Sequence, residues 1–255
     1  MNHLFLSPLE QFKIVAIIPL FNSNFVDMSF TNSTLALLLN FLVLFFITTM
    51  IGSGNFIPNR WETLKELVLI NIRNILNGSL GGTLKSKMVY LPLLLTFGIN
   101  IVLSNTLSMF PYSFAVTSHL IITLFLATVL FVPITGLAIK KHGVHSLSFF
   151  YPSGAPFPLV FLLVPIEATT YIFRVISLSV RLFANIMAGH ILLKVLAGFA
   201  WSMFLSPDGL IFSMHLLPVT VVTGLFGLEL GVAFIQAYVW LMLTCIYLND
   251  AIYLH

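Results

Sequence analysis

Two very long apolar tracts in the second half of the chain constrain its fold more than any other feature. The first runs from residue 158 to about residue 201, and the second follows a turn signal at 206–209 and continues to the C-terminus. A single helix of some 40 residues would be about 60 Å long, roughly twice the hydrocarbon thickness of a bilayer. The sequence therefore predicts a hairpin of two oversized membrane helices that tilt steeply, bend or run out of the membrane.

Composition extends this interpretation to the whole chain. Of its 255 residues, 59% are hydrophobic and only 7% are charged, whereas about a quarter of a soluble domain is charged. We therefore predict an all-α polytopic membrane protein with about five transmembrane helices and one amphipathic surface helix. The single cysteine, Cys245, excludes an internal disulfide and a cysteine-only metal cluster. The chain has no nucleotide-binding motif, and we predict neither a cofactor nor a metal site.

The pattern along the chain predicts one membrane domain, 1–255. The N-terminus lacks a basic region and carries Glu10 and Lys13, so it does not resemble a secretory signal, although a short processed leader before Ser7 stays open. Asn59 with Glu62 three residues later is typical of a helix N-terminus. The predicted parts are an N-terminal surface segment (1–32), a first span (33–51), an amphipathic surface helix (59–78), a helical hairpin (88–139) and a long tilted hairpin (158–255).

The basic residues predict the topology. They gather in the 52–87 segment and at 140–145, while the turn at 111–113 has none. By the positive-inside rule both basic segments face the interior, so the N-terminus is expected outside and the C-terminus inside.

One stretch of the first long tract carries polar residues at helical spacing. Glu167, Arg174 and Arg181 follow each other at intervals of seven, so each is turned only about 20° from the last. Asn185 lies one turn further on nearly the same face, which gives a polar seam roughly 27 Å long. His190 lies about half a turn away from this seam. An arginine at bilayer depth costs at least about 2.5–3.5 kcal/mol, so two of them indicate a function.

The last tract carries Glu229, Gln236 and Asp250. If Arg181 and Gln236 are level in an antiparallel pair, one register predicts three levels. Glu167 then lies beside Asp250, and His190 lies beside Glu229. This arrangement favours two water-accessible pockets, one from each side, separated by the fixed charge of Arg181. Passage between them needs a mobile carboxylate from another subunit.

Each residue also has a purely structural interpretation. Arg174 could pair with Glu167, and Glu229 and His190 could satisfy each other. Gln236 and Asn185 could form ordinary hydrogen bonds between helices, and Asp250 could only mark the aqueous end of its helix.

Three segments carry a resemblance to a known family: SLSVRLFANIMAGH (177–190), ELGVAFIQAYVW (229–240) and YLNDAIYLH (247–255). With SPLEQF, NTLSMFPYSFAVTSH and GFAW elsewhere, the chain closely resembles subunit a of the F-type ATP synthase in its mitochondrial form. Bacterial members carry the His and the carboxylate of positions 190 and 229 in the reverse arrangement, so the order here favours mitochondria.

The resemblance implies a stator subunit beside a rotating ring of c subunits, with the long hairpin lying against that ring. Protons would reach the ring carboxylates from the intermembrane space through one half-channel and leave to the matrix through another. The N-terminus would then face the intermembrane space and the C-terminus the matrix. Implied partners are the c-ring, subunit b of the peripheral stalk, other membrane subunits and lipids such as cardiolipin, with no nucleic acid. The implied proton-path residues are Arg181, Glu167, His190, Glu229, Gln236, Asn185, Asp250 and Arg174.

Two other classes of function deserve comparison. A haem- or quinone-binding respiratory subunit would need paired histidines on facing helices, and only His190 lies deep enough. A secondary transporter would show internal repeats and broken helices, and the sequence has neither.

Overall fold

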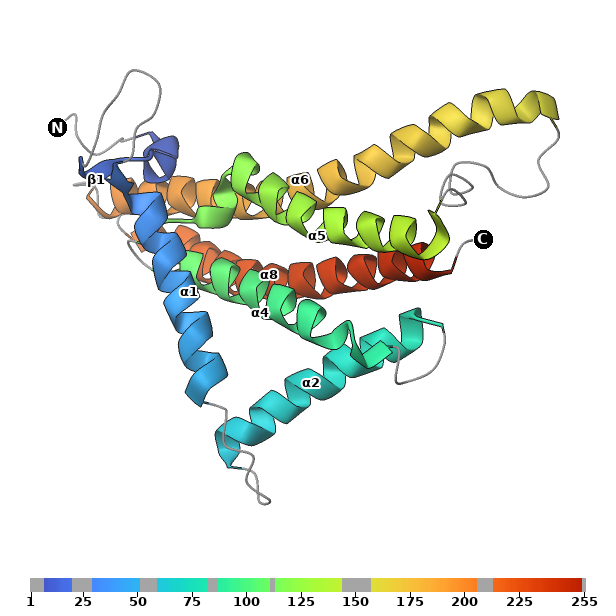
Figure 1. Ribbon diagram of the computed structural model, residues 1–255. Helices are drawn as coiled ribbons and strands as arrows, with labels where there is room; N and C mark the ends of the chain where they lie inside the picture. The colour runs from blue at the N-terminus through green and yellow to red at the C-terminus, as the bar shows by residue number, and fades with distance from the viewer. Residues whose placement is uncertain are drawn as a thin grey trace. The chain divides into compact units, whose positions relative to one another are not determined.

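The computed structural model describes residues 7–19, 29–50, 59–81, 87–110, 113–143, 157–205 and 213–253. Helices dominate these residues (Figure 1). Four of the described helices are long and apolar enough to cross a membrane, which confirms the all-α polytopic prediction. The helices are α1 (Asn32–Met50), α2 (Arg60–Ser79), α4 (Leu91–Ser108), α5 (Leu120–His142), α6 (Phe157–Phe204) and α8 (Leu216–Ile252), with the short 3-10 helices η1 (Pro8–Phe12) and η2 (Val116–Ser118).

The two oversized tracts form continuous helices. α6 has 48 residues and α8 has 37, so they are about 72 Å and 55 Å long. The four candidate spans are Leu91–Ser108, Leu120–His142, Val160–Phe204 and Leu216–Ile252, while the apolar part of α1, Asn32–Ile47, is shorter. The turn signal at 206–209 lies outside the described residues.

α2 begins where the capping pattern predicts. The Glu62 carboxylate accepts a hydrogen bond from the Asn59 backbone N–H at 2.8 Å, which satisfies one donor at the helix N-terminus. The helix ends at Ser79, one residue beyond the predicted stop at Gly78, and the Leu80 N–H bonds the Leu76 carbonyl. Its position along the membrane face stays a prediction.

The N-terminal segment contains a small sheet that the sequence analysis did not predict. β1 (Ala16–Ile18) pairs antiparallel with β2 (Phe30–Thr31). The Asn32 side chain fastens this pair to the start of α1, because it accepts from the Val15 N–H at 3.2 Å and donates to the Lys13 carbonyl at 3.0 Å.

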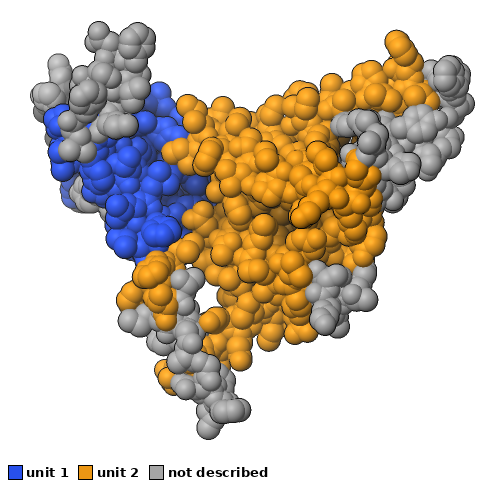
Figure 2. All heavy atoms as spheres, viewed as in Figure 1, with its two compact units in different colours: residues 1–43, 102–119, 182–236 blue, residues 44–101, 120–181, 237–255 orange. Residues whose placement is uncertain are grey.

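The chain divides into two compact units (Figure 2). Unit 1 comprises Met1–Val43, Val102–His119 and Leu182–Gln236, and unit 2 comprises Leu44–Ile101, Leu120–Arg181 and Ala237–His255. Helices α1, α4, α6 and α8 each contribute residues to both units. The predicted polar residues therefore fall into two groups, which are described in turn below.

Within unit 2, Gly98 lets α4 approach α8 closely. A Cβ at this position would lie 2.9 Å from Leu241 Cδ1, and Leu241 is itself buried. We expect Gly98→Ala to lower the free energy of unfolding by about 1–3 kcal/mol through overpacking. Gly136→Ala in α5 is the control, because nothing lies within 4 Å of its Cβ position, and it should stabilise by about 0.5–1 kcal/mol. Thermal unfolding of the purified protein measures both, and equal effects would contradict the close approach.

Candidate functional site

The first polar group, here called the His190 cluster, consists of His190, Glu229, Ser108 and Phe12 in unit 1. His190 Nε2 lies 3.7 Å from Glu229 Oε1 and 3.3 Å from Ser108 Oγ. The Phe12 ring packs edge-on against the imidazole at a centroid distance of 6.4 Å. Four elements, η1, α4, α6 and α8, thus converge on one titratable ring, and the predicted proximity of His190 and Glu229 is confirmed.

The Glu229 side chain packs against a glycine of α6. The residue is 5% exposed, and its carboxylate oxygens have no hydrogen-bond partner among the described residues. A Cβ on Gly189 would lie 2.8 Å from Glu229 Oε1 and 3.0 Å from Cδ. The carboxylate therefore lies directly over the α6 backbone, and the absence of a side chain at Gly189 brings it beside His190.

Further buried polar atoms of unit 1 lack partners among the described residues. Asn105 has no exposed surface, yet neither its Oδ1 nor its Nδ2 is hydrogen-bonded. The same holds for Thr117 Oγ1, Gln11 Nε2 and Gln236 Nε2. A buried polar atom without a partner costs roughly 1–3 kcal/mol, so such atoms usually meet water or take part in function. Sequence reasoning singled out neither Asn105 nor Thr117, although an asparagine in an apolar helix is itself a signal.

Gln236 is paired with Asn185 in unit 1. Asn185 Nδ2 donates to Gln236 Oε1 at 3.0 Å, and the two residues come from α6 and α8. Two amides complement each other as donor and acceptor, which favours this pair. The level of Arg181 beside Gln236 stays a prediction.

The second polar group, here called the Arg174 cluster, lies in unit 2. Arg174 Nη1 lies 3.4 Å from Asp250 Oδ2, with the two side chains 22% and 25% exposed. The guanidinium also covers the Tyr247 ring at 5.2 Å from its centroid. Phe131 packs edge-on against both Tyr247 and Tyr171, so aromatic rings lie next to this ion pair.

These contacts correct two expectations. Glu167 and Asp250 are not an acidic pair on their own, and Arg174 pairs with Asp250 rather than with Glu167. Coulomb attraction explains the choice, because a half-buried guanidinium beside a carboxylate lowers the cost of both charges. Glu167 itself is half-buried on α6.

Arg181 differs from Arg174. Its side chain is exposed, and within the described part of the chain it makes no hydrogen bond or ion pair. A permanently protonated guanidinium on an apolar helix without an internal partner is available to a carboxylate from another chain.

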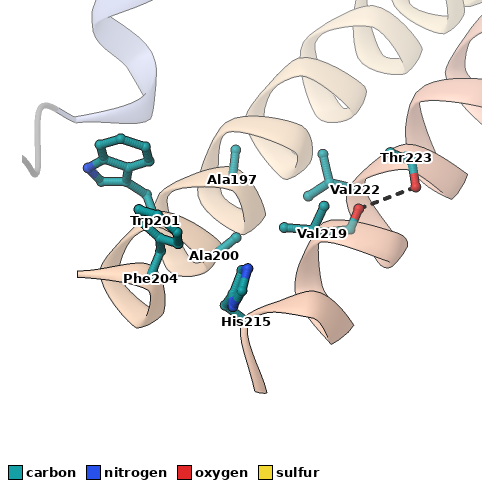
Figure 3. Close-up of a pocket in the computed structure, with 8 residues that line it drawn as sticks. All are labelled: Ala197, Ala200, Trp201, Phe204, His215, Val219, Val222 and Thr223. Atoms are coloured by element: carbon teal, nitrogen blue, oxygen red, sulfur yellow. Dashed lines mark hydrogen bonds between the residues drawn. The ribbon is translucent and has the colours of Figure 1, made fainter. Parts of the chain in front are cut away.

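One cavity of unit 1 contains none of the predicted residues. It has a volume of about 390 Å³ and is lined mainly by apolar side chains of α6 and α8 (Figure 3). The His215 ring lies at its edge and packs edge-on against Phe204 at 5.4 Å. Its apolar lining does not suit proton transfer.

The chain is similar to known proteins over nearly its whole length. The family model described as ATP synthase A chain matches residues 30–249. ATP synthase subunit a-2 of Arabidopsis thaliana is 47% identical over 98% of this chain and 72% of its own length. ATP synthase subunit a of Brassica napus and that of Marchantia polymorpha are each 46% identical over 98% of this chain, covering 97% and 99% of their own lengths.

A double-mutant cycle distinguishes the two possible partners of Arg174. We expect Arg174→Gln and Asp250→Asn to be coupled by about 1 kcal/mol in the free energy of unfolding, since the pair is half-buried. Arg174→Gln and Glu167→Gln should instead be additive. Thermal unfolding of the three single and two double variants measures this, and coupling to Glu167 alone would contradict the observed pair.

Proposed function

The chain belongs to the ATP synthase A chain family, and from this premise we propose that it is the stator subunit that carries protons to and from the c-ring of an F-type ATP synthase. Proton flow through two offset half-channels would drive rotation of the ring. The observation that carries the proposal is the division of its polar groups into a His190 cluster, an Arg174 cluster and Arg181, which has no hydrogen bond or ion pair with another described residue.

The His190 cluster is the proposed entry half-channel. Water bound by the unpaired atoms of Asn105, Thr117, Glu229 and Gln236 would give a proton successive acceptors inside an apolar bundle. His190 and Glu229 are groups that can bind and release a proton, which suits a relay. Asn185 would orient Gln236 through their hydrogen bond.

The Arg174 cluster is the proposed exit. The carboxylates of Asp250 and Glu167 would accept the proton as it leaves the ring. Arg174 would hold the Asp250 carboxylate in position between transfers through their contact at 3.4 Å. The face of the Tyr247 ring packs against the Arg174 guanidinium and holds it in position.

Arg181 separates the two paths. A free proton is repelled by the guanidinium, whereas an ionised ring carboxylate is attracted to it and passes without its proton. The exposure of Arg181 and its lack of a partner in the described chain support this role.

The location and partners follow from the family and the sequence. We propose the mitochondrial inner membrane, with the N-terminus toward the intermembrane space and the C-terminus toward the matrix. The c-ring, subunit b of the peripheral stalk, other membrane subunits and lipids such as cardiolipin are the proposed partners.

Replacing Arg181 tests the central charge. We expect Arg181→Ala to abolish proton-driven ATP synthesis in the assembled complex and to raise passive proton leak, because the barrier between the paths is lost. Lys194→Ala is the control, since it removes another cation from α6, and it should leave both rates near wild type. Retained synthesis in a normally assembled Arg181→Ala complex would refute the proposed mechanism.

A substitution at Gly189 tests the entry path without removing any ionisable group. We expect Gly189→Ala to push the Glu229 carboxylate away from His190 and to lower proton conductance several-fold. Gly198→Ala, also on α6, is the matched control because its Cβ position is open. Conductance in vesicles containing the assembled complex is the measurement, and equal rates for the two variants would show that the His190–Glu229 contact is dispensable.

A further inference from the structure

A second cavity lies in unit 2, at the ends of two predicted membrane spans. It has a volume of about 340 Å³ and is lined by Tyr90, Leu137, Lys140, Lys141, Ala251 and Ile252. None of these residues belongs to either polar cluster of the proposed proton path.

Hydrogen bonds join the C-terminal ends of α5 and α8 beside the cavity. Lys141 Nζ donates to the Ile252 carbonyl at 3.2 Å, and His142 Nε2 lies 3.1 Å from the same oxygen. The span of α5 ends at His142 and the span of α8 ends at Ile252. Because both apolar helices stop here, the cavity lies at the depth where a bilayer changes from acyl chains to headgroups.

The lining combines positive charge with an apolar wall. Lys140 is exposed and has no hydrogen bond or ion pair with another described residue. Lys141 is held in place by the Ile252 carbonyl and by the face of the Tyr253 ring, 5.3 Å from its centroid. An ammonium has three donors, so this carbonyl leaves capacity for a further acceptor. Leu137, Ala251 and Ile252 supply the apolar part.

No acidic side chain is among the described residues that line the cavity. Asp250, the acidic residue next to Ala251 in the chain, is already paired with Arg174. The two ammonium groups therefore lack a compensating carboxylate in the lining, and an anion would gain charge-assisted hydrogen bonds there.

We propose that this cavity binds the phosphate headgroup of an anionic phospholipid from the leaflet on the basic side of the membrane. The phosphate would lie between Lys140 and Lys141 with the Tyr90 hydroxyl as a further donor, and the acyl chains would follow Leu137 and Ile252. A basic pocket between membrane helices at headgroup depth is typical of lipid recognition. The apolar wall favours a phospholipid over free phosphate, which gains nothing from it.

Photo-crosslinking tests the site within the assembled complex. The probe is phosphatidylglycerol with a photoreactive acyl chain, used in phosphatidylcholine nanodiscs and mapped by digestion and mass spectrometry. We expect labelling at the C-terminal ends of α5 and α8 that falls several-fold in Lys140→Gln, which keeps Lys141 and its helix contacts. Lys65→Gln on α2 removes the same charge elsewhere and should leave labelling unchanged.

Competition distinguishes the sources of the anion. Unlabelled phosphatidylglycerol should abolish the labelling, whereas excess phosphatidylcholine or inorganic phosphate should not. Unchanged labelling in Lys140→Gln, or equal competition by phosphatidylcholine, would overturn the proposal. Displacement by inorganic phosphate would assign the site to a free anion instead. These outcomes do not depend on proton transport, so they test the lipid site separately from the proposed function.

Discussion

The free-energy cost of burying polar and charged side chains among apolar helices determines which residues of this protein must pair. An ionised group at bilayer depth must be paired, hydrated or offered to another chain, because the hydrocarbon supplies no compensation. Arg174 with Asp250, His190 with Glu229, and Asn185 with Gln236 each join a residue of α6 to a residue of α8. These polar contacts thus pair the two longest helices, which otherwise present mostly apolar surface.

Several polar groups do not take part in such pairs. Among the residues that the structure describes, Asn105, Thr117 and the carboxylate of Glu229 are buried without hydrogen-bond partners, and Arg181 is exposed without one. A protein that only needed stability would replace such groups with apolar ones at little cost. Bound water or a carboxylate from another chain would supply the missing contacts of these groups, as the proposed proton path requires.

Sequence reasoning predicted the long helices and singled out polar residues on them, but it did not predict all of their contacts. The single straight register between the last two helices placed Asp250 beside Glu167, whereas the structure pairs Asp250 with Arg174. Gln236 contacts Asn185, and Asp250 contacts Arg174. A displacement of one or two turns changes every partner across a helix pair, and no local pattern specifies it.

Local chemistry determined the elements, because apolar length and helical periodicity act over neighbouring residues and require no distant contact. The sequence alone therefore predicted the four long apolar helices, the cap of α2 at Asn59 and the presence of polar residues on α6 and α8, whereas the apolar part of α1 is shorter than the predicted first span. Tertiary structure decided which of these groups meet, since that depends on how closely two helices approach. Gly189 shows the difference: it looks unremarkable in the sequence, but its missing side chain lets the Glu229 carboxylate lie beside His190.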